Sequence, residues 1–150
     1  MIPEVFSPIT PAVALLAVST VATAWMTWAA WTHRRRAHVT ELGVLNGLAF
    51  AWALLAFVYH LLDASGPRHV LLDLRYVPIT LRPVAWLVFS WAASGLPRLS
   101  LRGVALISAV PAMTLFLLGS NGMHGLMFSG LYELPNRWSV VVGHEFGPWF

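Results

Sequence analysis

The stretch RPVAWLVFSW, residues 82–91, opens an apolar hairpin that continues through a short basic loop to His124. Arg82 and Pro83 stand at its start, and the second apolar run, residues 104–118, contains a proline of its own, Pro111. Runs of this kind are too apolar for the surface of a soluble protein and are typical of transmembrane helices. The hairpin therefore predicts a membrane protein.

Composition leads to the same conclusion. Hydrophobic residues make up 58% of the 150 residues and charged residues 10%, and the mean hydropathy is +0.71. Soluble domains contain about 25% charged residues, so lipid must be the main solvent of this chain. Cysteine is absent, which excludes disulfides, thiolate metal sites and cysteine nucleophiles. The nine basic residues are all arginines and lie mostly in loops rather than along one stripe, which argues against nucleic-acid binding.

We predict an all-α integral membrane protein with four transmembrane helices and an irregular outer C-terminal extension, together forming a single membrane domain. A helix needs about 20 apolar residues to cross a hydrocarbon core. Glycines and prolines interrupt the last part of the chain, where Ser139 to Val142 is the strand that β-branched content favours. The predicted spans cover residues 9–32, 42–62, 76–94 and 103–119, and the extension covers residues 120–150.

The distribution of arginines predicts the orientation of the helices. The loops predicted to lie inside contain five arginines, at positions 34–36, 98 and 102, whereas the outer segments contain three, at positions 68, 75 and 137. An excess of basic residues marks the cytoplasmic loops of membrane proteins. We therefore expect a multi-pass membrane protein with both termini outside.

Small residues mark one face of the second predicted span. Gly43, Gly47 and Ala51 recur every four residues, and this spacing lets two helix backbones approach closely in a membrane. We favour packing within the chain over homodimerisation, which stays open as the alternative.

Four pieces of the second half, taken in order, resemble the N-terminal seven-transmembrane region of prokaryotic histidine kinases. They are PVAWLVF at 83–89, the helix centred on Pro111, GSN at 119–121 followed by HGL at 124–126, and GPWF at 147–150. The resemblance covers residues 10–150 and implies a sensor or input module, embedded in the prokaryotic cytoplasmic membrane, that is not an enzyme. In the family, this part leads into three more helices and then into cytoplasmic signalling and kinase domains, and none of these is found in the 150 residues.

A second function stays open beside the sensor-like module. A fold of this family without output domains can also serve as a structural accessory subunit of a larger membrane complex, including a photosynthetic or other energy-transducing pigment-protein assembly. The expected partners are the lipid bilayer and either other membrane-protein subunits or a second copy of the chain.

Arg82 is the foremost candidate for a functional side chain. An arginine at membrane depth usually has a partner or a function, and its simpler interpretation is snorkelling to the outer interface. Pro83 weakens the helix next to it, and Trp86 lies deeper in the same span. We predict that these three residues contact a ligand or a partner. The anionic groups we consider for Arg82 are Asp63, Asp73, a lipid phosphate and a carboxylate of another subunit.

Two histidines, His60 and His124, lie near outer helix ends and complete the predicted contact residues. An imidazole there can ligate a metal or a chlorophyll-type magnesium, although an interfacial hydrogen bond is the commoner role. We predict no metal site and no cofactor, with a pigment contact at these histidines as the alternative. His144-Glu145-Phe146 superficially resembles a kinase phosphoacceptor box but lies in the broken tail. No hydrolase or nucleotide-binding motif occurs, so no enzyme is predicted.

Overall fold

The computed structural model describes residues 11–34, 38–62, 68–97, 99–135 and 140–149. The predicted spans agree with the four long helices to within three residues at each described end, the largest difference being the start of the second helix at Val39. The elements in chain order are α1 (Pro11–Thr32), α2 (Val39–Leu61), α3 (Arg68–Leu74), α4 (Tyr76–Ala93), α5 (Leu101–Gly119), α6 (Asn121–His124), β1 (Phe128–Pro135) and β2 (Val140–Phe146).

Several hydroxyl groups of α1 and α5 form hydrogen bonds within their own helix. In α1, the hydroxyls of Thr20, Thr23 and Thr27 each donate to the carbonyl four residues back at 2.7 Å. At the start of α5, the Ser100 hydroxyl accepts from the Gly103 amide at 3.1 Å and caps the helix. Because these groups have partners inside their own helix, they can lie in a lipid environment without the cost of an unsatisfied hydrogen-bonding group.

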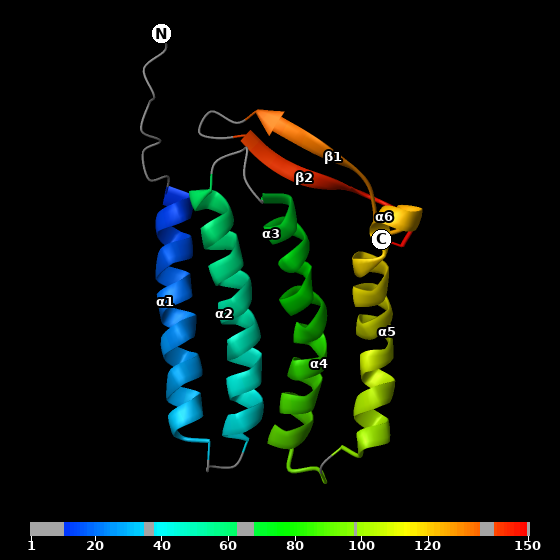
Figure 1. The fold of residues 1–150 in the computed structure, drawn as a ribbon. Coiled ribbons are helices and arrows are strands. Elements are labelled where there is room, and N and C mark those ends of the chain that lie inside the picture. Colours follow the sequence, from blue (N-terminus) through cyan, green and yellow to red (C-terminus); the bar gives the residue numbers. More distant parts are fainter. Residues whose placement is uncertain (1–10, 35–37, 63–67, 98, 136–139, 150) are drawn as a thin grey trace.

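The four long helices stand side by side in a single row, in the order α1, α2, α4, α5 (Figure 1). Each packs mainly against its neighbours in the row. α3 continues almost directly into α4 and lengthens it at the end that lies nearest the strands (Figure 1). The chain therefore forms an open layer of helices with two broad faces.

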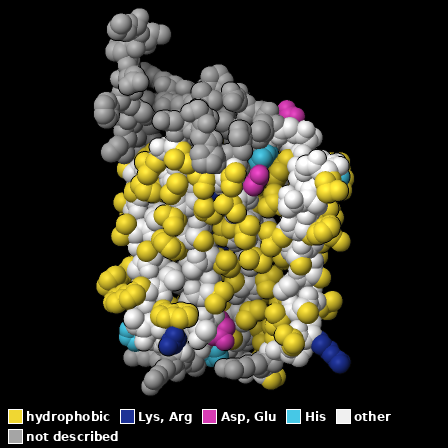
Figure 2. All heavy atoms as spheres, viewed as in Figure 1, with side chains coloured by type: hydrophobic (Ala, Val, Ile, Leu, Met, Phe, Trp, Pro, Cys, Tyr) yellow, Lys and Arg dark blue, Asp and Glu magenta, His cyan; other side chains and the backbone are white. Residues whose placement is uncertain are grey.

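The surface of this layer is suited to lipid. Figure 2 shows hydrophobic side chains across the middle of one face, with charged side chains near its upper and lower margins. Large apolar side chains that would be costly in water are exposed, among them Leu101 at 86%, Leu106 at 77% and Phe116 at 69%. The buried core is correspondingly small and includes Leu45, Ala53, Ala56, Tyr59, Leu72, Leu117, Met127 and Phe128.

Within the described residues, three helices are long and apolar enough to cross a membrane: α1, α2 and α5. α4 falls outside this group because Arg82 and the prolines Pro78 and Pro83 lower the hydropathy of its 18 residues. The expectation of four transmembrane helices is thus supported by composition for three of them, and α4 lies in the row between α2 and α5 (Figure 1).

The prediction of an irregular C-terminal extension is wrong. β1 and β2 form an antiparallel hairpin, paired from Phe128 opposite Phe146 to Pro135 opposite Val140. The predicted strand begins at Ser139, which lies outside the described residues, and the structure extends that strand through Phe146. Glycines that suggested irregularity have defined places: Gly125 has φ of 63°, and Gly130 adjoins the bulge in β1.

Candidate functional site

A groove of about 520 Å³ lies between α2 and α4 and surrounds Arg82. Its residues are Leu45 and Trp52 of α2 and Pro78, Ile79, Arg82, Pro83 and Trp86 of α4.

Helical spacing explains why these side chains share one groove. Pro78, Arg82 and Trp86 recur every four residues and lie on one face of α4, and Leu45 and Trp52 lie two turns apart on one face of α2. The structure thus brings together the predicted contact residues Arg82, Pro83 and Trp86. Trp52 of α2 lies in the same groove.

The depth of Arg82 can be measured against a contact near the end of the helices that lies next to the β1–β2 hairpin. The guanidinium carbon of Arg75 lies 4.9 Å from the centre of the Tyr59 ring, so these two residues mark one level. Arg82 and Trp52 each lie seven residues further in, which corresponds to about 10 Å at the α-helical rise of 1.5 Å per residue. Arg82 therefore lies level with Trp52, well inside the row of helices.

Arg82 is a cation in apolar surroundings. Its side chain is exposed to the groove, and it makes no hydrogen bond, ion pair or cation–π contact within the described residues. The structure pairs Asp73 with His144 instead of Arg82, and Asp63 lies outside the described residues. A neighbouring hydrophobic groove between the same helices, lined by Val44, Leu48, Val84 and Val88 among others, contains Glu41 but no cation.

The predicted packing face of α2 lies against α1. A side-chain carbon added at Gly43 would lie 3.4 Å from the Cβ atom of Ala30, and one added at Gly47 would lie 3.7 Å from a methyl group of Thr27. Ala51 continues this row on α2 and is partly buried. Small residues therefore allow the backbones of α1 and α2 to approach closely within one chain.

The two predicted histidines have different surroundings. His60 is partly buried at the end of α2 and meets the edge of the Tyr59 ring, with 5.2 Å between ring centres. His124 accepts a hydrogen bond from the Leu126 amide at Nδ1 (3.0 Å), so its Nε2 carries the proton and can donate to the Ser120 hydroxyl at 3.0 Å. Both ring nitrogens of His124 are therefore engaged. Among the described residues, no group of three or more His, Cys, Asp or Glu side chains could hold a metal.

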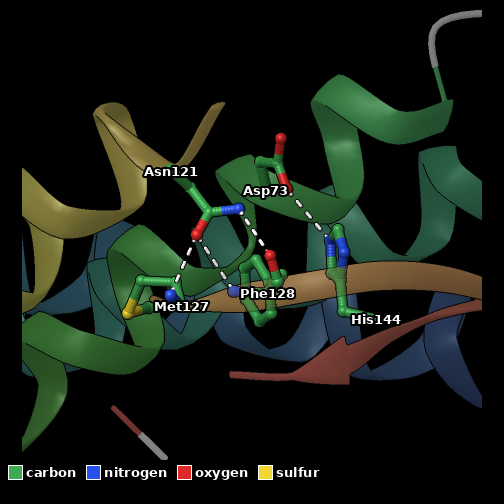
Figure 3. Close-up of polar contacts among 5 residues, drawn as sticks. All are labelled: Asp73, Asn121, Met127, Phe128 and His144. Carbon is green, nitrogen blue, oxygen red and sulfur yellow. Dashed lines mark hydrogen bonds and ion pairs between the residues drawn. The ribbon is translucent and has the colours of Figure 1, made fainter. Parts of the chain in front are cut away.

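At the end of α5, Asn121 binds the start of the hairpin (Figure 3). Its Oδ1 accepts from the amides of Met127 (2.9 Å) and Phe128 (3.0 Å), and its Nδ2 donates to the Phe128 carbonyl at 3.0 Å. Met127 is fully buried and Phe128 is 6% exposed. Asn121 thus fixes the hairpin to the end of α5, and we call this contact the Asn121 clamp.

A second contact joins the hairpin to α3. Nε2 of His144 in β2 lies 3.0 Å from Oδ1 of Asp73, an ion pair when the imidazole is protonated (Figure 3). The His144 ring also stacks on Phe128, with 3.9 Å between ring centres and 13° between planes, and Tyr76 at the start of α4 lies 6.1 Å away. The hairpin is therefore tied to the α3–α4 rod as well as to α5.

Sequence reasoning did not single out Asn121 or His144 as structural contacts. Asn121 has a weak signal, because it is a polar residue that directly follows an apolar helix and stands within the GSN segment of the family resemblance. His144 has none, since its partners Asp73 and Phe128 lie in other elements.

The comparisons with known proteins agree with the resemblance noted in the sequence. Residues 15–150 match the family described as the N-terminal 7TM region of histidine kinase. No curated protein and no solved structure matches the chain.

Proposed function

Because this chain belongs to the family of N-terminal seven-transmembrane regions of histidine kinases, we propose that it is a membrane input module whose sensing site is the groove around Arg82. The module detects its stimulus within the membrane and passes the change on through α4. It performs no chemistry of its own.

In this proposal α4 also spans the membrane, as the third of four spans in chain order, and both chain ends lie outside. Its place between α2 and α5, with both of which it packs, supports this assignment despite the arginine in its sequence. The excess of arginines in and next to the loops that join α1 to α2 and α4 to α5 supports an inner position for those loops.

The single observation on which the proposal rests is Arg82, a cation without a partner among the described residues, about 10 Å inside the outer level on a helix that also contains Pro83. A charge in such a position is a functional site by default. Pro83 cannot donate to the Ile79 carbonyl, so α4 is weakened beside the charge. Occupation of the groove can therefore change the bend of α4.

Contacts at both ends of α4 can transmit a change in its bend to other parts of the chain. On the outer side, α3 and Tyr76 contact His144 of the hairpin, which the Asn121 clamp joins to α5. On the inner side, the Trp91 ring nitrogen donates to the Pro97 carbonyl at 2.8 Å and ties the end of α4 to its loop. A movement of α4 would thus reach both membrane surfaces.

A chromosomal substitution in the organism of origin tests the proposal. Arg82→Leu should alter the phosphorylation of at least one response regulator, measured by phosphate-affinity gels, because loss of the cation changes the state of the input module. Arg102→Leu, at an exposed arginine at the start of α5, is the matched control and should behave as the wild type. Unchanged phosphorylation in the Arg82→Leu strain would refute the sensory role. Co-purification in fixed stoichiometry with a pigment-protein complex would favour the accessory-subunit function instead.

A further inference from the structure

We infer that the groove binds a long-chain carboxylic acid, with the carboxylate at Arg82 and the hydrocarbon chain along Trp86 and Leu45. This inference rests on the proposed function in taking the groove as the sensing site, and it adds the chemical class of the ligand.

The lining of the groove requires a ligand that is mostly apolar. Leu45, Trp52, Ile79 and Trp86 present aliphatic and aromatic surfaces, and Pro78 and Pro83 add no side-chain donor. Sites for small ligands have this character, with volumes of about 300–1,000 Å³ and few polar groups that fix orientation. A free inorganic anion would leave this apolar surface unused, whereas a hydrocarbon chain would cover it.

The charge in the groove requires an anionic head group. Arg82 is a cation without a partner among the described residues, and pairing it in apolar surroundings removes the cost of an isolated charge. The planar guanidinium can form two parallel hydrogen bonds with one carboxylate, a geometry that a lysine ammonium does not provide. The head group is therefore expected to be a carboxylate bound in a bidentate manner.

Depth distinguishes a single-chain acid from a membrane phospholipid. Arg82 lies about 10 Å further in than the level marked by Arg75 and Tyr59. The phosphate and glycerol of a phospholipid belong to the polar interface, so a phospholipid would have to sink by most of this distance. A fatty acid has only a small head group to desolvate once it pairs with Arg82.

The positions of the lining residues set the direction of the chain. Trp52 is level with Arg82, Trp86 lies one turn further toward the inner side, and Leu45 lies two turns further in along α2. Leu45 is 8% exposed and Trp86 is 56% exposed, so the deeper part of the groove has a buried wall and an aromatic surface open to the chain. The hydrocarbon chain is thus directed toward the inner side.

The test uses photoaffinity labelling of the full chain in nanodiscs of phosphatidylcholine, with diazirine-bearing palmitic acid as the probe. Mass spectrometry of the labelled peptides should find the label on α2 and α4 residues of the groove. Oleate should compete at least about tenfold better than methyl oleate, because a hydrogen bond to a charged group contributes enough free energy for a tenfold change or more. Equal competition by the acid and its neutral ester would overturn the inference.

Variants locate the effect at Arg82. Arg82→Leu should weaken labelling of the groove by about tenfold or more, Arg82→Lys should retain part of it, and the control Arg102→Leu should match the wild type. Circular dichroism and size exclusion establish that each variant is folded. If Arg82→Leu does not fold, the comparison of acid with ester on the wild-type chain decides alone.

Two further outcomes would also overturn the inference. One is labelling of the same residues by a photoactivatable phosphatidylglycerol that palmitate does not displace, which would identify a phospholipid as the occupant. The other is a cross-link from position 82 to an acidic side chain of a second protein, which would make Arg82 a subunit contact. Labelling reports binding and not signalling. If the wild-type chain binds the fatty acid but the Arg82→Leu strain shows unchanged response-regulator phosphorylation, the sensory role is refuted and the ligand class stands.

Discussion

Replacing Asn121 with alanine should release the start of the hairpin from the end of α5. The side chain makes three hydrogen bonds, two accepted from the Met127 and Phe128 amides and one donated to the Phe128 carbonyl. Each bond contributes about 0.5–1.5 kcal/mol, and the loss leaves buried backbone groups without partners, so the expected local destabilisation is about 2–4 kcal/mol. Met127 is fully buried, which places the effect toward the upper end of this range.

Amide hydrogen exchange measures this local effect without requiring the whole protein to unfold. A loss of about 2–4 kcal/mol corresponds to exchange at Met127 and Phe128 that is about 30-fold or more faster. Ser120→Ala is the neighbouring control: it removes hydroxyl contacts with Phe116 and His124 that lie at the exposed surface, and it should cost about 1 kcal/mol or less. Protection of the two amides within twofold of the wild type in Asn121→Ala would refute the clamp.

Three other substitutions test the packing of the fold. Gly147→Ala should destabilise the hairpin by about 2–3 kcal/mol, because the added carbon would lie 2.6 Å from the Gly125 carbonyl oxygen. In the control Gly122→Ala, the added carbon meets nothing within 4 Å. Limited proteolysis of the hairpin distinguishes the two variants, and equal cleavage would contradict the close approach at Gly147. Gly43→Leu should destabilise the contact between α1 and α2 by about 1–3 kcal/mol, seen as faster unfolding in detergent, while Gly119→Leu in an open position should have little effect. His144→Ala should speed amide exchange in the hairpin more than Asp73→Ala does. The His144 side chain is 8% exposed and stacks on Phe128, whereas the Asp73 side chain is 50% exposed and its ion pair contributes about 1 kcal/mol or less. Faster exchange in Asp73→Ala than in His144→Ala would show that the ion pair dominates.

The helices could be predicted from sequence because their signal is local. The length of a helix follows directly from its run of apolar residues, such as Val104 to Leu118. The cap formed by Ser100 and Gly103 also lies within a single turn. The packing face of α2 was also visible in the sequence, since glycines at 43 and 47 add nothing to an isolated helix but allow close contact with a neighbouring one.

The hairpin could not be predicted in the same way, because its stability depends on contacts between distant residues. β1 is paired with β2 across a turn, and Gly147 fits against the carbonyl groups of Gly125 and Leu126 only once the chain has folded back. The glycines therefore suggested irregular structure when read singly.

The candidate site was half visible from sequence. Arg82, Pro83 and Trp86 are recognisable because they belong to one helix and depart from its apolar pattern. The α2 wall depends on the register of two antiparallel helices, which places Trp52 level with Arg82. No local pattern in α2 records that register.

Sensing at Arg82 requires that this residue lie inside a membrane-spanning α4. The chain contains no cysteine, so single cysteines placed along residues 76–93 can be spin-labelled one at a time in nanodiscs and tested for collision with oxygen and with a water-soluble nickel chelate. If α4 spans the membrane, oxygen accessibility should be highest and nickel accessibility lowest around residues 82–86, with both ends of α4 reaching the chelate. Collision with the chelate along the whole helix would show that α4 lies outside the hydrocarbon core and would contradict both α4 as a membrane span and the groove as a membrane site.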